Sequence, residues 1–259
     1  MTIGVFDSGI GGLTVYSSII EKFESLDVYY LGDTARVPYG NKSEETICRY
    51  SLECANFLIE QFDISCLVVA CNTASSFALN FLRSKVSIPV IGVVDPGAKQ
   101  AAYFTKNKKI GVIGTIGTIK SNSYSKSIKN LDPSIEIYQN PAPLLVPLVE
   151  EGRINHKITK LALKEYIQPL VNKGVDTLVL GCTHYPVLKE EIHKLYPELI
   201  LIDSSLAVLP EIEKCIDLSG GDTAKRLIFT TDRTEAFELL KQRIVGDIKS
   251  EKVDLKEFV

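Results

Sequence analysis

Short apolar runs alternate with longer amphipathic segments along the whole chain, and this alternation constrains the fold most. Most of the runs are continuously apolar and rich in β-branched residues, as strands buried on both faces of a parallel sheet are. Strands are predicted at Ile3–Phe6, Val28–Leu31, Leu67–Ala70, Val90–Val93, Ile110–Ile113, Ile135–Tyr138, Thr177–Leu180, Leu199–Ile202 and Leu227–Thr230. Helices are predicted between strands, among them Ser43–Gln61, Asn155–Asn172 and Thr234–Arg243. The pattern predicts an α/β protein with mostly parallel sheets flanked by helices.

An internal repeat divides this pattern into two halves. In each half a strand rich in small apolar residues is followed, 68 or 72 residues later, by a cysteine: Ile3 leads to Cys71 and Ile110 leads to Cys182. Cys71 directly follows a further apolar strand, and Cys182 follows another with only Gly181 between them. We therefore predict two pseudo-symmetric lobes that each place one thiol in the cleft between them.

The predicted lobes are not continuous in sequence. The segment after residue 203 is too short for a third domain, so we expect it to return and complete the first lobe. The predicted first lobe comprises residues 1–95 and 206–259 and carries Asp7 and Cys71. The predicted second lobe comprises residues 96–205 and carries Cys182 and His184.

Composition excludes several classes of protein. The 259 residues include 29 Lys and Arg against 32 Asp and Glu, a net charge of −3, which argues against a nucleic-acid partner. No apolar run approaches the ~18 residues of a membrane span, and the opening residues do not resemble a secretion signal, so we expect a cytoplasmic protein with reduced thiols. The cysteines show no CxxC pair or zinc-like spacing, so no metal site is expected.

Two of the six cysteines are candidates for chemistry. Cys71 and Cys182 lie between a predicted strand and a predicted helix start, where Thr73 is expected to cap the first helix and Pro186 to open the second. The positive end of a helix dipole favours a thiolate, and ligands bind at the carboxyl ends of parallel strands. The remaining cysteines are interpreted as packing residues: Cys48, Cys54, Cys66 and Cys215.

Polar residues near these thiols are suited to proton transfer. Asp7 follows the first strand, and His184 lies two residues beyond Cys182. The glycines after the first strand lack the GxGxxG pattern, and Gly114–Lys120 is not a Walker A sequence, so no nucleotide cofactor is expected. Turns rich in glycine and hydroxyl groups can instead bind carboxylates through backbone N–H groups.

Four motifs together resemble those of the glutamate racemases in the aspartate/glutamate racemase superfamily. The resemblance runs from Ile3 to about Ser205 and includes every position that is catalytic in that family. The motifs are Gly4–Thr14, Gly32–Gly40, Ala70–Ser75 and Gly181–Pro186.

The resemblance implies a cofactor-independent racemase that uses two cysteines as bases. It implies that Cys71 acts on D-glutamate with help from Asp7, and that Cys182 acts on L-glutamate with help from His184. Glu150 matches a further family acid near the second thiol. The substrate contacts that the resemblance implies are Asp7, Ser8, Tyr39, Gly40, Asn72, Thr73, Thr115, Thr183 and His184.

The resemblance also bears on the product, the assembly and regulation. D-Glutamate would supply peptidoglycan precursors, and relatives in this family are often dimers, which leaves a homodimer open. Some relatives that need a cell-wall precursor as activator carry an N-terminal extension. Here the first strand is reached by Ile3, so activity on glutamate alone is expected.

Three alternatives remain open from the sequence. An aspartate racemase of the same superfamily would share the two thiols, and an assay of both amino acids separates the two. A non-catalytic, two-lobed amino-acid-binding module would need no thiols in its cleft. A nucleotide-dependent oxidoreductase would need a phosphate-binding fingerprint that the sequence lacks.

Overall fold

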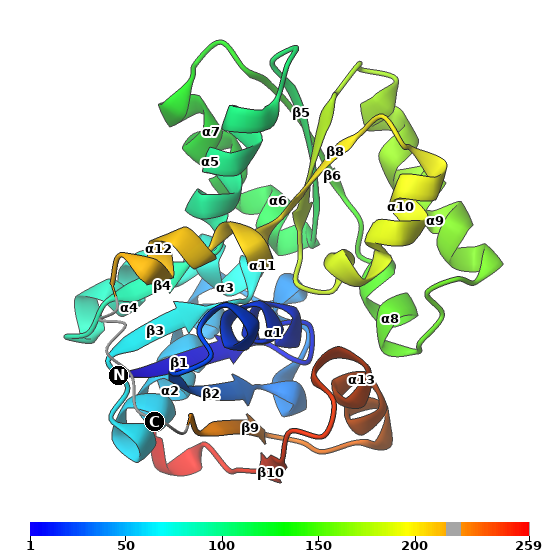
Figure 1. The fold of residues 1–259 in the computed structure, drawn as a ribbon. Coiled ribbons are helices and arrows are strands. Elements are labelled where there is room, and N and C mark those ends of the chain that lie inside the picture. The colour runs from blue at the N-terminus through cyan, green and yellow to red at the C-terminus, as the bar shows by residue number, and fades with distance from the viewer. Residues whose placement is uncertain (216–223, 259) are drawn as a thin grey trace.

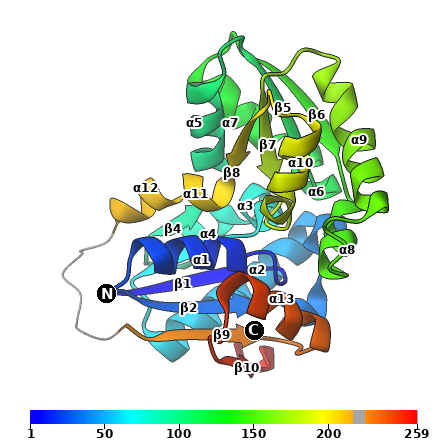
Figure 2. The ribbon, with the colours of Figure 1, turned by 45° about the vertical axis from the view of Figure 1, so that its right-hand side comes forward.

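The computed structural model describes residues 1–215 and 224–258 and contains two lobes, each built on a parallel sheet (Figure 1). The first lobe has a six-stranded sheet in the order β10-β9-β2-β1-β3-β4, and the second a four-stranded sheet in the order β6-β5-β7-β8. Helices flank both sheets (Figure 2). This arrangement confirms the predicted two-lobed α/β class.

The elements of the first lobe alternate along the chain as predicted. Its strands are β1 (Thr2–Asp7), β2 (Asp27–Gly32), β3 (Cys66–Val69), β4 (Val90–Gly92), β9 (Arg226–Thr230) and β10 (Ser250–Lys252). Its helices are α1 (Leu13–Lys22), α2 (Glu44–Phe62), α3 (Asn72–Phe77), α4 (Leu79–Lys85) and α13 (Glu235–Val245), with short 3-10 turns at Thr34–Arg36, Tyr39–Asn41 and Lys256–Phe258.

The second lobe repeats this alternation. Its strands are β5 (Lys109–Gly114), β6 (Glu136–Pro141), β7 (Thr177–Gly181) and β8 (Ile200–Asp203). Its helices are α5 (Val94–Phe104), α6 (Ile116–Ser121), α7 (Ser123–Leu131), α8 (Leu145–Glu150), α9 (Lys157–Val171) and α10 (Lys189–Leu195), with a 3-10 turn at Tyr185–Leu188. The short helices α11 (Ser204–Ala207) and α12 (Leu209–Glu213) run along the junction of the lobes (Figure 1).

Each sheet is buried on both faces, which explains the continuously apolar strands. Along β3, Val68 packs into the core on one face while Leu67 and Val69 pack into the core on the other. Along β7, Leu178 packs into the core on one face of the sheet and Val179 into the core on the other. Successive side chains of a strand point to opposite faces, so both must be apolar when helices cover both.

The internal repeat corresponds to equivalent strand pairs. In the first lobe β1 pairs in parallel with β3, and Ile3 lies opposite Cys66. In the second lobe β5 pairs in parallel with β7, and Ile110 lies opposite Thr177. Cys71 and Cys182 therefore follow equivalent strands, at the same edge of their sheets.

Two predicted details differ at the sheet edges. A strand is predicted at 135–138, but β6 spans Glu136–Pro141 and is only partly buried. Strand β10, which is short and polar, is not predicted by the sequence pattern at all. Edge strands need no continuous apolar run, so the pattern that marks the central strands fades there.

After residue 224 the chain forms β9, which pairs in parallel with β2 of the first sheet. The exact domain boundaries at 95 and 206 stay a prediction. Across residues 1–215 and 224–258, none of the helices has the length and apolar character needed to cross a membrane.

Candidate active site

Cys71 begins α3 and caps it with its own side chain. The backbone N–H of Ala74 donates to Cys71 Sγ at 3.4 Å, and the thiol donates to Ser8 Oγ at 3.3 Å. The prediction that Thr73 caps this helix was wrong, because Thr73 already lies inside it. The Thr73 hydroxyl instead lies 2.9 Å from Thr115 Oγ1 of the second lobe.

The surroundings of Cys71 favour the neutral thiol. Burial raises the pKa of Cys71 to about 12, and the negative charge of Asp7 acts in the same direction. The hydrogen bonds with Ser8 and Ala74 oppose this shift without reversing it. The positive end of the helix dipole favours a thiolate here, and the burial of the sulfur at the start of the short α3 opposes it.

Cys182 is the first member of a chain of three polar groups. Its Sγ lies 3.7 Å from His184 Nδ1, and His184 Nε2 lies 3.0 Å from Glu150 Oε1 on α8. Burial lowers the pKa of His184, but the hydrogen bonds to Cys182 and Glu150 outweigh it and raise this pKa to about 10. The imidazole is thus held as a cation between a sulfur and a carboxylate.

Asp7 is fully buried at the end of β1 and connects the two lobes. Its carboxylate accepts hydrogen bonds from Gly9 N at 2.9 Å and from Thr183 Oγ1 of the second lobe at 3.2 Å. Burial raises the pKa of Asp7, while the nearby charge of His184 and these hydrogen bonds oppose the shift. Asp7 therefore acts on Cys71 through its charge and on the second lobe through Thr183.

Both thiols line one small enclosed cavity of about 20 Å³ between the lobes, and both are free cysteines. The structure thus brings the two predicted bases together with most of the predicted substrate contacts. Asp7 lies outside the cavity lining, and Glu150 lies behind the imidazole of His184. The lining residues are Ser8, Val37, Pro38, Tyr39, Gly40, Cys71, Asn72, Thr73, Thr115, Val146, Cys182, Thr183 and His184.

Three of these lining residues were not among the sequence candidates. Val37 and Pro38 stand in one of the recognised motifs, and Val146 lies on α8 one turn before Glu150. Their side chains are apolar and carry no chemical signal in a single sequence. They give the cavity part of an apolar lining, and apolar walls that exclude water strengthen electrostatic interactions inside a site.

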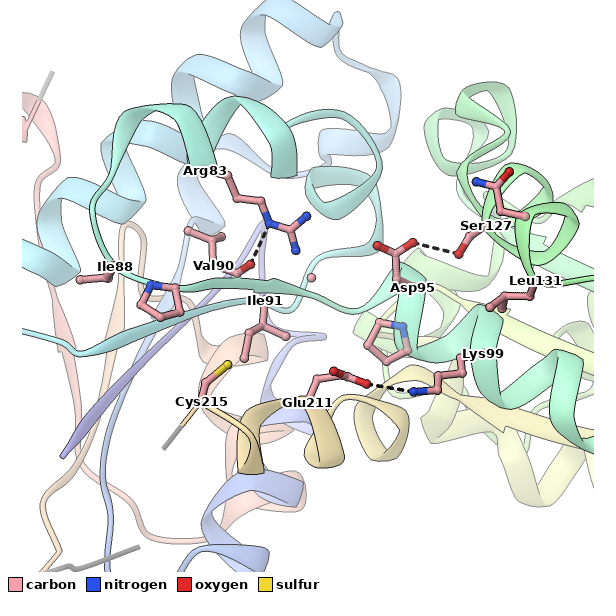
Figure 3. A pocket seen from close by; sticks show the side chains of 14 residues that line it. Arg83, Ile88, Val90, Ile91, Asp95, Lys99, Ser127, Leu131, Glu211 and Cys215 are labelled. Atoms are coloured by element: carbon pink, nitrogen blue, oxygen red, sulfur yellow. Dashed lines mark hydrogen bonds and ion pairs between the residues drawn. The ribbon is translucent and has the colours of Figure 1, made fainter. Parts of the chain in front are cut away.

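A second hollow, of about 650 Å³, lies elsewhere at the junction of the lobes (Figure 3). Its polar groups are largely paired with one another: Arg83 Nε donates to the Val90 carbonyl, and Lys99 lies 3.5 Å from Glu211. None of the predicted site residues lines it. Within the described part of the chain, no cluster of three or more His, Cys, Asp or Glu side chains is arranged to hold a metal ion.

Residues 3–212 match the family described as Asp/Glu/Hydantoin racemase. The chain belongs to this family. It is accordingly an enzyme of the isomerase class, a racemase, and the predicted family resemblance is confirmed. This racemase is 58% identical over 258 residues to the glutamate racemase of Sulfurihydrogenibium sp. (strain YO3AOP1), and the match covers 100% of this chain and 99% of the relative.

Solved structures agree with this assignment. Glutamate racemase isoform RacE1 from Bacillus anthracis has a TM-score of 0.93 and 40% identity, over 98% of this chain and 97% of that chain. Glutamate racemase from Francisella tularensis, in complex with D-glutamate, has a TM-score of 0.89 and 35% identity, over 99% and 98%. The two-lobed fold of this racemase is therefore shared over its whole length with enzymes of known structure.

Proposed function

We propose that this racemase interconverts L- and D-glutamate with two cysteine bases and no cofactor. The observation that carries the proposal is the meeting of Cys71 and Cys182, from equivalent positions of two lobes, at one cavity. Inversion at an α-carbon needs a base on one face and an acid on the other, and two related lobes supply both.

The proposed reaction conserves protons and electrons. A thiolate on one face removes the α-proton of glutamate and becomes a thiol, and the electron pair left behind is delocalised into the α-carboxylate. The thiol on the opposite face then donates its proton to the α-carbon and becomes a thiolate. The next turnover in the same direction follows after the two sulfurs exchange protons with solvent.

The contacts of the two thiols suit a state that accepts L-glutamate. The raised pKa of Cys71 keeps its proton available for donation. His184 Nδ1 lies 3.7 Å from Cys182 Sγ, close enough to exchange a proton with it. With Cys182 as base and Cys71 as acid, the product of this state is D-glutamate.

The cavity offers neutral donors to an anionic substrate. Hydroxyl, amide and backbone N–H groups surround it, and its lining contains no lysine or arginine. At about 20 Å³ it has room for roughly one water molecule, so glutamate requires the lobes to separate. Opening would break the hydrogen bonds of Thr73 with Thr115 and of Asp7 with Thr183.

The nature of the relatives supports glutamate as the substrate. The 58% identical relative is a glutamate racemase, and the similar Francisella tularensis enzyme was crystallised with D-glutamate.

We further propose that the D-glutamate formed enters peptidoglycan precursors in the cytoplasm. Growth of a D-glutamate auxotroph that expresses this chain, without added D-glutamate, tests this role. A homodimer stays a prediction that light scattering of the purified protein tests.

The decisive experiment follows the α-hydrogen in heavy water. The purified protein is incubated with L-glutamate, D-glutamate, L-aspartate or D-aspartate, and deuterium incorporation and optical rotation are measured. We expect both glutamate enantiomers to racemise with deuterium at the α-carbon. Racemisation of aspartate alone would identify an aspartate racemase. Binding of glutamate without exchange would contradict catalysis at these thiols.

A further inference from the structure

Tyr124, on α7 of the second lobe, reaches across the junction of the lobes to the residue that follows Cys71. Its hydroxyl donates to Asn72 Oδ1 at 2.6 Å, and both side chains are almost fully buried. Asn72 lines the cavity between the thiols, whereas Tyr124 does not. Tyr124 is thus in contact with the site without reaching the place of the substrate.

The hydrogen bond from Tyr124 determines which way the Asn72 amide faces. An amide has an acceptor oxygen on one side and an NH₂ donor on the other, and its orientation follows from its partners. Burial raises the pKa of Tyr124, so the hydroxyl stays protonated and remains a donor. With Oδ1 engaged, Nδ2 donates to Ser204 Oγ at 3.4 Å, and the Ser204 side chain also hydrogen-bonds the Tyr124 hydroxyl.

One N–H of the amide is left for a ligand. Nδ2 carries two hydrogens, and its bond to Ser204 uses one of them. In residues 1–215 and 224–258, no protein acceptor takes the other. A carboxylate can only accept hydrogen bonds, so this orientation of Asn72 suits an anionic substrate, and the flipped amide would present its oxygen instead.

The ring of Tyr124 lies in space that two glycines leave open because they carry no Cβ. A Cβ on Gly97 of α5 would lie 3.2 Å from Tyr124 Cε1, and a Cβ on Gly181 would lie 3.2 Å from Tyr124 Cε2. Gly181 directly precedes Cys182, and Asn72 directly follows Cys71. Tyr124 therefore lies against Gly181 and Asn72, the residues next to the two thiols, although it belongs to a helix of the second lobe.

We infer that Tyr124 is a positioning residue of this active site, whose hydroxyl fixes the Asn72 amide with an N–H group presented to a substrate carboxylate. This inference rests on the proposed glutamate racemase function. It assigns Tyr124 no part in proton transfer, so its loss should weaken substrate binding in both directions more than it slows the chemical step.

The variant Tyr124→Phe keeps the packed ring and removes only the hydroxyl. We expect KM to rise about tenfold for both L- and D-glutamate, with a smaller change in kcat, because Asn72 loses the partner that orients it. The matched control is Tyr16→Phe, which removes the hydroxyl of another fully buried tyrosine, one without a hydrogen-bond partner among residues 1–215 and 224–258. Tyr16→Phe should leave both constants unchanged. An unchanged KM in Tyr124→Phe would overturn the inference.

Nuclear magnetic resonance of the Asn72 side-chain amide tests the same point without turnover. The amide signals are assigned by their loss in Asn72→Asp. In the wild-type protein they should shift when D-glutamate is added, and in Tyr124→Phe they should move before any ligand is added. Amide signals that respond to neither change would refute the role of Tyr124. If Tyr124→Phe does not fold, an absent shift on D-glutamate binding to the wild type still refutes it.

These measurements separate the two proposals. An inactive wild-type protein would contradict the racemase reaction, whereas the position of the Asn72 signals in Tyr124→Phe reports only on the orientation of the amide. A normal racemase with an unaffected KM in Tyr124→Phe would leave the proposed function intact and overturn the inference alone.

Discussion

Glu150 Oε1 lies 3.0 Å from Nε2 of His184, and the other nitrogen of that ring faces Cys182 Sγ. The carboxylate is half-buried while the imidazole is almost fully enclosed. A buried imidazole alone would lose its proton readily, and the pKa of about 10 instead depends on these two contacts. Glu150 thereby controls the charge next to one of the proposed bases without touching the cavity.

Replacing Glu150 by glutamine should lower the pKa of His184. The imidazole is a cation below this pKa. Without the carboxylate charge, the pKa of His184 should be lower than the present value of about 10 by about 1 pH unit or more. The alkaline limb of kcat for L-glutamate should move down accordingly. At neutral pH, where the imidazole still carries its proton, kcat should change far less than by the ~10²–10⁴-fold typical of a direct proton-transfer partner.

The control for this variant is Glu151→Gln, because Glu151 is exposed and pairs with Arg153 instead. Its pH profile should match that of the wild type. An alkaline limb that stays in place in Glu150→Gln would show that the charge of His184 does not limit the reaction.

Substitution of either cysteine in the cavity should abolish racemisation, because each direction needs one base and one acid. Cys71→Ser and Cys182→Ser should each reduce kcat by about 10²–10⁴-fold or more. Cys48→Ser is the control, since Cys48 is a half-buried packing residue whose thiol faces the Phe77 carbonyl.

The two cysteine variants should differ in a reaction that needs only one base. With 3-chloroglutamate, a thiolate removes the α-proton and the electron pair of the C–Cl bond leaves with chloride. Cys71→Ser should release chloride from the L-configured analogue only, and Cys182→Ser from the D-configured analogue only. Full racemisation by either variant, or chloride release without regard to configuration, would contradict the assignment of the bases.

Much of the site could be predicted because its chemical groups stand at recognisable positions. Asp7, Cys71 and Cys182 follow buried strands whose apolar runs are unmistakable, and parallel strands bring their carboxyl ends to one edge. The ionisation of Cys71 could not be predicted in the same way. It depends on how completely the folded chain encloses the sulfur, which no local pattern encodes.

Contacts between the lobes were also out of reach of sequence patterns. Tyr124 meets Asn72 from 52 positions away, and Thr73 meets Thr115 instead of capping its own helix. A tyrosine in the first turn of a helix resembles an ordinary core residue. Its role becomes visible only when the second lobe is placed against the first.

Asp7→Asn should lower the pKa of Cys71. The negative charge of Asp7 is one of the causes that raise this pKa to about 12. Without the charge, the thiolate should form at lower pH. The measurement is the ultraviolet absorbance of thiolate against pH, as the difference between each protein and its Cys71→Ser counterpart.

Asp7→Asn should at the same time lower kcat by about 10²–10⁴-fold with a smaller effect on KM. The control is Asp63→Asn, because Asp63 is an exposed carboxylate at the end of α2 whose left-handed backbone suits asparagine. A thiolate titration at unchanged or higher pH in Asp7→Asn would show that Asp7 does not act on Cys71 through its charge.

Gly11 leaves the space that His184 occupies, and Gly11→Ala should fill it. A Cβ at Gly11 would clash with Thr183 Oγ1 and lie 2.5 Å from His184 Nδ1, so these side chains must shift, and we expect the imidazole to be displaced from Cys182. Because the displaced imidazole no longer faces the sulfur, the pKa of His184 should fall from about 10 towards its ordinary value, as imidazole proton resonances would report. We expect kcat to fall by about 10²-fold or more.

Overpacking also costs stability, typically about 1–3 kcal/mol, so the decrease in activity must be separated from unfolding. Gly4→Ala is the matched control, because its Cβ would lie 2.5 Å from Ile64 Cδ1 in the core of the first lobe. Both variants should unfold at lower denaturant concentration than the wild type, but only Gly11→Ala should change the titration of His184. A folded Gly11→Ala protein with wild-type kcat and an unshifted His184 would show that the approach of His184 to Cys182 is dispensable for turnover.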